Sequence, residues 1–255
     1  MRPLFGIPIL ILAFSLLSCA RHQGENIKLP EDIRRGREIF YDPNYGSTGL
    51  ACANCHADFD DVNHPDDKIR PGHNLIGAHK RKVTWYGRFR GDALNITAAG
   101  AGLCVVMYQK KYGVTNPLKA LTPEDAQALL AYFEFISKDT AIEKLTSQPI
   151  VLPWEEESIR KEKIRQIKGK ILTLSGVPEN GAIIYEKACA QCHSEEGDLA
   201  PQIFRPEITA EKIIEMVRAG SPASAETPMP FFTSDKLTDQ EIADLIAYIM
   251  RSQGR

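Results

Sequence analysis

Two five-residue stretches, Cys52-Ala-Asn-Cys-His56 and Cys189-Ala-Gln-Cys-His193, share the pattern C-x-x-C-H. Two cysteines three residues apart lie on one turn of a helix, and the histidine that follows can turn its ring toward a common centre. A zinc site needs four ligands, usually from a second pair at similar spacing, whereas these pairs lie far apart and each has its own histidine. A thioredoxin-like dithiol belongs to a βαβ setting, and no such pattern surrounds either stretch. The chain therefore carries two equivalent sites.

C-x-x-C-H is the attachment pattern for c-type haem, in which both thiols bond covalently to the porphyrin and the histidine is the proximal iron ligand. The sequence thus predicts two covalently attached haem c groups. The expected residues are Cys52, Cys55 and His56 at the first site and Cys189, Cys192 and His193 at the second.

The start of the chain has the pattern of an export signal. Arg2 is followed by an apolar run over residues 4–17, which ends at Leu16-Leu-Ser-Cys19. A short charged region, an apolar core and a small residue before the cut are typical of secretory signals. The ending resembles the lipobox of bacterial lipoproteins and implies lipidation of Cys19, a signal peptide at 1–18 and a tether at 19–29. An uncleaved anchor is the alternative, although the run is short for a membrane span. Both interpretations place the rest outside the cytoplasm, on the periplasmic face of a bacterial membrane.

Chain length, net charge and cysteine count limit the possible domain number, partners and functional groups. The chain has 255 residues, which suits two small domains, and a formal net charge of −2, which implies no nucleic-acid partner. Of six cysteines, four are assigned to haem and one to lipid, so Cys104 remains. An odd cysteine in an exported protein is a candidate functional group.

A weak internal repeat accompanies the two motifs. Residues 121–132 (LTPEDAQALLAY) and 237–248 (LTDQEIADLIAY) are identical at five of twelve positions. In each, the threonine at the second position is followed three residues later by an acid, the capping-box pattern of a helix start, and apolar residues at helical spacing come after it. The sequence therefore predicts the same order of elements in each half: a helix, a haem motif, a long irregular segment and a final helix.

This order resembles the cytochrome c fold, in which a glycine lets the first and last helices cross closely with aromatic residues beside it. The resemblance implies an all-α protein with two tandem cytochrome c-like domains, at 30–137 and 178–255, joined by a charged, partly helical linker at 138–177. The residues expected at the two crossings are Gly36, Phe40 and Tyr132, and Gly181, Tyr185 and Tyr248.

The two halves differ outside this shared frame. The first is about 21 residues longer between its haem histidine and final tyrosine, mostly within residues 58–95, and long loops in compact domains are usually functional or wrap something. In the linker, residues 155–170 place acids before bases, which suits a helix dipole and predicts a solvated connector helix.

The resemblance also implies further ligands. A proline carbonyl is expected to orient each haem histidine, from Pro71 at the first site and Pro201 at the second. Met229, in Thr227-Pro-Met-Pro-Phe231, resembles the distal methionine of the family, and His/Met ligation raises the reduction potential.

The sixth ligand of the first haem stays open among Cys104, Met107, one of three histidines (His64, His73 and His79) and no protein ligand. The segment Gly102-Leu-Cys-Val-Val-Met107 resembles the one that places a cysteine on iron in thiosulfate dehydrogenases and the A subunit of the Sox complex. Cys104 at iron would be a thiolate. The alternative is that Cys104 is simply a small buried apolar residue on a helix.

Residues 36–55 also resemble the first haem segment of dihaem peroxidases. The favoured function is nevertheless electron transfer, as a carrier or as a subunit of a redox complex with redox protein partners, because fully ligated haems usually transfer electrons. An oxidoreductase of the thiosulfate dehydrogenase or Sox type, or a peroxidase-like enzyme, is the alternative.

Overall fold

The computed structural model describes residues 29–61, 63–138, 148–152, 154–194, 199–221 and 228–254, and these are rich in helix. The α-helices are α1 (Glu31–Tyr41), α2 (Cys52–Cys55), α3 (Ala93–Cys104), α4 (Pro123–Ser137), α5 (Glu157–Ile171), α6 (Pro178–Ile184), α7 (Ala190–His193), α8 (Ala210–Ala219) and α9 (Asp239–Ser252). Short 3-10 helices are η1 (Ala78–Lys80), η2 (Trp85–Gly87) and η4 (Pro117–Lys119), and π-helices are η3 (Val105–Gln109) and η5 (Tyr185–Cys189). Cys19 and the expected signal peptide lie outside the described residues.

The helix-rich fold agrees with the all-α expectation, and one small hairpin is its only strand pair among the described residues. Strands β1 (Val83–Thr84) and β2 (Phe89–Arg90) pair antiparallel, with Val83 opposite Arg90. The strands are two residues long, too short to show the alternation by which strands are recognised in a sequence.

The expected helix starts are confirmed. The Thr122 hydroxyl accepts a hydrogen bond from the backbone N–H of Asp125, and Pro123 is the first residue of α4. At α9, Thr238 and Glu241 form the reciprocal pair of a full capping box. These bonds satisfy backbone donors that have no partner within the helix.

In the N-terminal half, α1 crosses α4 at a glycine. A Cβ atom on Gly36 would lie 2.1 Å from the carbonyl oxygen of Ala128 and 2.7 Å from Cβ of Tyr132, so any side chain would force the helices apart. Phe40, which is fully buried, packs beside Tyr132 with ring centroids 5.8 Å apart. The predicted close crossing is thus present.

The C-terminal half repeats this crossing between α6 and α9. A Cβ atom on Gly181 would lie 2.0 Å from the carbonyl oxygen of Asp244 and 2.7 Å from Cβ of Tyr248. Tyr185 packs 5.8 Å from the Tyr248 ring. In the repeat, Asp244 and Tyr248 occupy the positions of the two residues that Gly36 meets in the first half, so the two crossings use equivalent residues.

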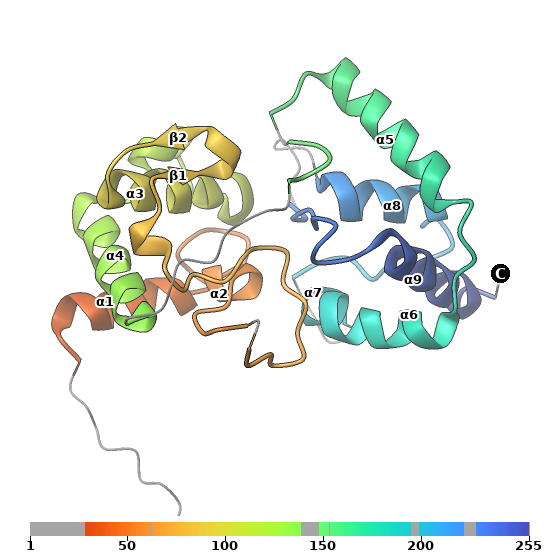
Figure 1. Ribbon diagram of the computed structural model, residues 1–255, viewed down its shortest axis with the longest axis horizontal. Helices are drawn as coiled ribbons and strands as arrows, with labels where there is room; N and C mark the ends of the chain where they lie inside the picture. Colours follow the sequence, from red (N-terminus) through yellow and green to blue (C-terminus); the bar gives the residue numbers. More distant parts are fainter. Residues whose placement is uncertain are drawn as a thin grey trace, which may run out of the picture.

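Helices α1–α4 lie on one side of the molecule and α5–α9 on the other (Figure 1). Each side has its own apolar core, one built around α1 and α4 and one around α6, α8 and α9. A third cluster joins the sides, because Leu50, Leu103, Met107 and Tyr108 pack with Trp85, Phe89, Cys104, Trp154, Cys192 and Leu199. The backbone N–H of Ile69 also donates to the Lys187 carbonyl at 2.9 Å, so the two sides share an interface.

Helix α5 differs from the solvated connector that its charges predict. Its buried residues are Arg160, Ile164, Ile167 and Ile171, and the last two belong to the core of the C-terminal half. The isoleucines recur at helical spacing, a signal that the charged residues between them obscured. Among the described residues, no helix combines the length and apolar character needed to span a membrane.

Candidate functional site

The first C-x-x-C-H motif forms a single helical turn followed by an extended residue. The backbone N–H of His56 donates to the Cys52 carbonyl at 2.9 Å, which closes α2. The Asn54 side chain accepts from the backbone N–H of Ala51 at 2.7 Å and fixes the start of the turn. His56 then leaves the helix with φ −127°, so both thiols and the imidazole come from one rigid turn.

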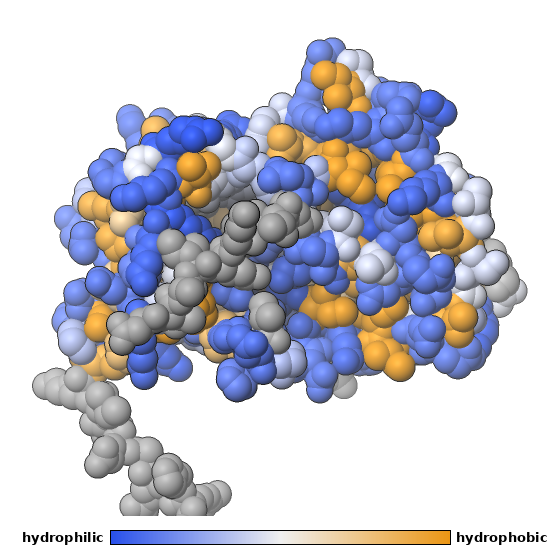
Figure 2. Space-filling model, viewed as in Figure 1, coloured by the Kyte–Doolittle hydropathy of each residue, from blue (hydrophilic) through white to orange (hydrophobic). Residues whose placement is uncertain are grey.

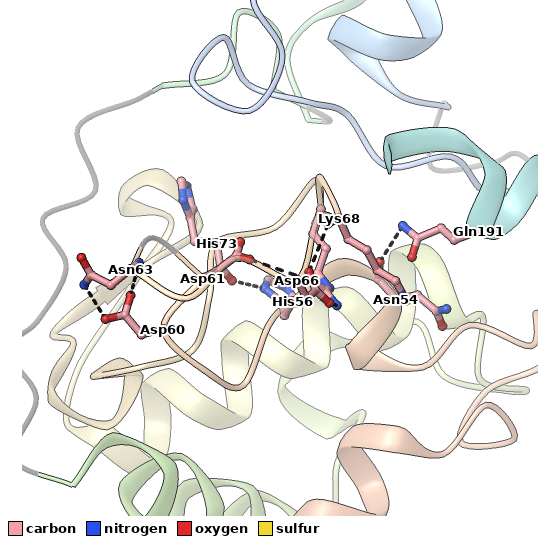
Figure 3. A network of polar contacts seen from close by, with 10 residues as sticks. Asn54, His56, Asp60, Asp61, Asn63, Asp66, Lys68, His73 and Gln191 are labelled. Carbon is pink, nitrogen blue, oxygen red and sulfur yellow. Dashed lines mark hydrogen bonds and ion pairs between the residues drawn. The ribbon is translucent and has the colours of Figure 1, made fainter. Parts of the chain in front are cut away.

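The His56 ring is held by a backbone carbonyl. Its Nδ1 atom lies 2.6 Å from the carbonyl oxygen of His73, a contact drawn in Figure 3. Gly72 lies against the ring, where a Cβ atom would be 2.4 Å from Cε1 of His56, and its N–H donates to the Cys55 carbonyl at 2.9 Å. The acceptor is therefore not Pro71, as the sequence suggested, because the turn fixed by Gly72 brings the carbonyl two residues further along to the ring.

The second motif begins at Cys189, the last residue of the π-helix η5. Nδ1 of His193 lies 2.7 Å from the carbonyl oxygen of Pro201, the acceptor that the sequence suggested. The hydroxyl of Tyr185 donates to the His193 carbonyl at 2.8 Å, which ties the motif to the helix crossing. In both halves Nδ1 is thus occupied by a carbonyl, and Nε2 is the nitrogen left for a metal.

Burial keeps both imidazoles neutral. It lowers the pKa of His56 to about 4, against the hydrogen bond to His73, and it lowers the pKa of His193 against the bond to Pro201. A neutral imidazole is the form that binds a metal, so the metal-free rings already have the required protonation state.

The four motif cysteines are free and hold their protons. Burial raises the pKa of Cys52 to about 11 and that of Cys55 and Cys189 to about 12, and it also raises the pKa of Cys192. Neither pair forms a disulfide, so each presents two reduced thiols on one turn. Within the described ranges, no group of three or more His, Cys, Asp and Glu side chains could hold a metal ion directly.

The two motifs touch each other. The Gln191 side chain donates to the Asn54 carbonyl at 3.2 Å, as Figure 3 shows, and both are internal residues of a C-x-x-C-H motif. Cys55 lies close enough to Cys192 for the second thiol to help raise the pKa of the first. The two candidate sites are therefore neighbours across the interface between the halves.

Cys104 lies beside the first motif. It ends α3, and the π-helix η3 begins at the next residue; such distortions are frequent at functional sites. Burial raises the pKa of its thiol well above the ordinary value, and the nearby Cys52 and Cys55 raise it further. Met107, the alternative ligand, is buried in the apolar cluster that Cys104 borders.

The three candidate histidines of the first half differ in environment. His64 is exposed. His73 and His79 are partly buried, and Nε2 of His73 and Nδ1 of His79 are buried without a hydrogen-bond partner in the described structure. Burial lowers the pKa of His73 to about 4 and also lowers that of His79.

Met229 lies in a loop that is held by hydrogen bonds to the backbone N–H and carbonyl of Met229 itself. Its N–H donates to the Ser221 hydroxyl at 2.8 Å, and its carbonyl accepts from the N–H of Ser221 at 2.9 Å. Gly220 precedes with φ +65°, and a Cβ atom there would lie 2.7 Å from the Met229 carbonyl oxygen. The side chain packs against the core of the C-terminal half.

One buried residue next to this loop was not expected from the sequence. Arg160 of α5 is 8% exposed, and its Nη2 donates to the carbonyls of Ala219 and Gly220, each at 3.2 Å. These carbonyls end α8, directly before Ser221 and the Met229 loop. The only signal in the sequence is that Arg160 lies one helical turn before Ile164, on the apolar face of α5.

The donor set fits covalently bound haem. Each half offers two reduced thiols on one turn and a neutral histidine whose free nitrogen is Nε2. Gly72 packs directly against the His56 ring, at a place where any side chain would clash with it, and the His73 carbonyl sets the direction of Nδ1. These are the requirements of thioether attachment with a proximal histidine.

Residues 176–249 match the family model described as cytochrome c oxidase, cbb3-type, subunit III. No curated protein matches the chain. No solved structure matches it either. The matched segment contains the second motif, the α6–α9 crossing and the Met229 loop, and it leaves out α5 and the N-terminal half. The chain thus contains a c-type cytochrome domain at residues 176–249, which implies covalently bound haem c, a role in electron transfer and redox protein partners.

Proposed function

We propose that this protein is a dihaem c-type cytochrome with two tandem cytochrome c domains, at 30–137 and 178–255. The single observation that carries this proposal is the equivalence of the two helix crossings. Gly36 and Gly181 meet the same two positions of the repeat at nearly the same distances, and each crossing is followed by a C-x-x-C-H motif. The N-terminal half therefore has the frame of the half that matches a cytochrome c family.

The contact between the motifs supports electron transfer between the halves. A covalently bound haem supplies one-electron iron chemistry at each site. The protein holds the motifs together through the bond from Gln191 to Asn54 and the shared cluster around Tyr108 and Cys192. We infer a role as an electron carrier or as a subunit of a redox complex.

The two sites differ in their proposed sixth ligands. Met229 is the ligand proposed for the second haem, and its loop is fixed by two hydrogen bonds with Ser221. Cys104 is proposed for the first, with Met107 as the alternative. The closeness of Cys104 to Cys52 and Cys55 supports this assignment, and ligation would require its buried thiol to lose a proton to the solvent as the metal binds.

The same position of Cys104 favours a second candidate function, a haem oxidoreductase that acts on a sulfur compound. Reduction of the protein by thiosulfate would distinguish the two. A pure carrier is not reduced by thiosulfate without a partner protein, whereas the enzyme is, and its Cys104→Ser variant loses the reaction.

Export and lipidation complete the proposal. A signal at 1–18 and an acylated Cys19 would place the haem domains on the periplasmic face of a bacterial membrane. Release of the Cys19→Ala variant from the membrane fraction would agree with lipidation, and retention would indicate an uncut anchor.

Mass spectrometry of the mature holoprotein tests the haem count. The expected mass exceeds that of the polypeptide by two haem groups, and Cys52→Ala/Cys55→Ala and Cys189→Ala/Cys192→Ala each remove one. A wild-type mass with one added haem would refute the dihaem proposal without any variant.

Electron paramagnetic resonance of the same samples tests the ligands. Met229→Ala should remove the methionine-to-iron absorption band and change one low-spin signal, and Cys104→Ser should change the other. If both signals persist unaltered in Cys104→Ser, Cys104 is only a core residue.

A further inference from the structure

The hairpin of the N-terminal half is strongly basic. Residues 80–90, here called the basic hairpin, contain five lysines and arginines and no acid, in a chain whose net charge is −2. Lys80, Lys82, Arg88 and Arg90 are exposed, and the surface over β1 and β2 is mostly hydrophilic in Figure 2. Neither the resemblance to known cytochromes nor the matched family segment accounts for it.

Most of this positive charge is not neutralised within the described part of the chain. Lys82, Arg88 and Arg90 form no ion pair with any described residue. Asp92, the next acid along the chain, caps α3 through bonds to the backbone and side chain of Asn95 at 2.9 and 2.8 Å. The charges are therefore available to an anionic partner.

The hairpin is firmly attached to the helix that ends at Cys104. The indole of Trp85 donates to the carbonyl of Gly100 in α3 at 2.9 Å. Trp85 and Tyr86 both have positive φ, 50° and 54°, a strained conformation that their contacts must offset. The exposed charges are thus presented on a fixed surface.

Aromatic rings lead from the hairpin to the first haem motif. Trp85 stacks on Tyr108 with centroids 6.5 Å apart and meets Trp154 edge-on at 6.0 Å. Tyr108 is buried and lies close enough to Cys104 and Cys55 for both thiols to affect its pKa. The basic surface and the first site are therefore linked by packed side chains.

The orientation of these rings favours a protein over a lipid surface. A hairpin that binds membranes offers aromatic and apolar side chains to the lipid. Here Trp85 packs on Tyr108 and Trp154, and Tyr86 packs 6.4 Å from Phe231 in the opposite half. The exposed part of the hairpin is charged, which suits an acidic protein surface.

We propose that the basic hairpin is the docking surface for an acidic redox protein that exchanges electrons with the first haem. The inference rests on the proposed function, because it assigns a place and a charge to one of the partners. Opposite charge on the two surfaces would speed their encounter, and salt would weaken it.

The test compares two double variants of the holoprotein with the same change in charge. Lys82→Glu/Arg90→Glu alters the hairpin, and Lys161→Glu/Arg165→Glu alters the outer face of α5, where both side chains are 73% exposed. Stopped-flow oxidation of the reduced protein is measured with anionic hexacyanoferrate(III), with cationic tris(phenanthroline)cobalt(III) and with an acidic blue-copper protein.

At low ionic strength the hairpin variant should react about tenfold more slowly with the anion and the acidic protein, and faster with the cation. The differences should vanish at high salt, and the control should behave as the wild type. Equal effects of both variants, or rates that do not depend on the probe's charge, would overturn the proposal. So would unchanged rates combined with lost binding to phosphatidylglycerol vesicles, which would identify a lipid contact. The haem content of each sample tests the proposed function separately.

Discussion

Replacement of Arg160 by methionine should loosen the loop that carries Met229. Arg160→Met keeps an unbranched stem on the apolar face of α5 and removes the donor to the carbonyls of Ala219 and Gly220. Both carbonyls lie in buried residues, so no solvent replaces the lost donor. Gly220 leads directly into Ser221, which holds Met229 through two hydrogen bonds.

The magnitude follows from this geometry. One nitrogen serves both carbonyls at 3.2 Å, so the pair counts as a single long bond from a charged donor, worth about 1.5 kcal/mol. Two buried carbonyls left without a partner cost about 1 kcal/mol each, if part of the loss is recovered by relaxation. The expected loss of unfolding free energy is about 3.5 kcal/mol, which lowers the urea midpoint by about 1.8 M at a slope of about 2 kcal/mol per M.

Urea unfolding of the holoprotein, followed by circular dichroism, measures this loss, and the absorption band expected from the proposed Met229 ligation would report on the loop. Arg165→Met is the matched control, because Arg165 lies on the exposed face of the same helix and, among the described residues, pairs with Glu162 alone. A stability of Arg160→Met equal to or above that of the wild type would show that desolvation of the guanidinium cancels its bonds. The idea that Arg160 stabilises the segment leading into the Met229 loop would then be refuted.

Two further predictions concern the C-terminal half. Gly181→Ala should destabilise the protein by about 3 kcal/mol, because the new Cβ would lie 2.0 Å from a carbonyl oxygen of α9. Gly169→Ala, at an exposed helical position with nothing within 4 Å, should instead stabilise the protein by about 0.5–1 kcal/mol. Urea unfolding measures both changes, and equal effects of the two variants would contradict the crossing geometry. Burial opposes ionisation of Asp239, but its hydrogen bonds with Lys170 and the buried Arg218 outweigh this and lower its pKa. Its stabilising contribution is therefore complete above the ordinary aspartate pKa of about 3.9 and is lost as the pH falls through the lower folded pKa. Asp239→Asn should be less stable than the wild type at pH 7 and should approach it in acid, and parallel pH profiles of the two proteins would contradict this.

The sequence predicted the parts of the fold that depend on local pattern. Helix starts at Thr122 and Thr238 follow from capping chemistry that involves residues three apart. The crossings at Gly36 and Gly181 were recognised because the motif occurs twice and each copy supports the other. Such features are encoded within short segments, and a second copy of the same pattern supports the interpretation of the first.

The carbonyl that orients His56 could not be assigned in this way. The sequence suggested Pro71, and the acceptor is His73. The difference arises from the turn at Gly72, whose N–H bonds the Cys55 carbonyl and whose missing side chain accommodates the ring. A displacement of two residues within a loop depends on contacts with the motif itself, and composition does not encode it.

The hairpin was missed for a related reason. Trp85 and Tyr86 have positive φ, which bulky aromatic residues rarely adopt, so local propensity argues against the observed turn. Their contacts with Tyr108, Trp154 and Phe231 come from three other segments, one in the linker and one in the opposite half. A conformation stabilised by tertiary packing gives no local signal.

The extra length of the first half is used at the interface. Within residues 58–95, Asp67 pairs with Lys187 at 3.1 Å, and the backbone of Ile69 bonds the carbonyl of the same lysine, two residues before the second motif begins. The hairpin in the same segment makes ring contacts with Trp154 of the linker and with Phe231 of the opposite half. Ile69 packs against the core of the C-terminal half, whereas Leu75 and Ala78 of the same segment belong to the core of the N-terminal half. Shortening the segment should therefore weaken both the association of the halves and the folding of the N-terminal half. The longer segment of the first half is therefore best understood as an element that holds the two motifs side by side while it completes the core of its own half.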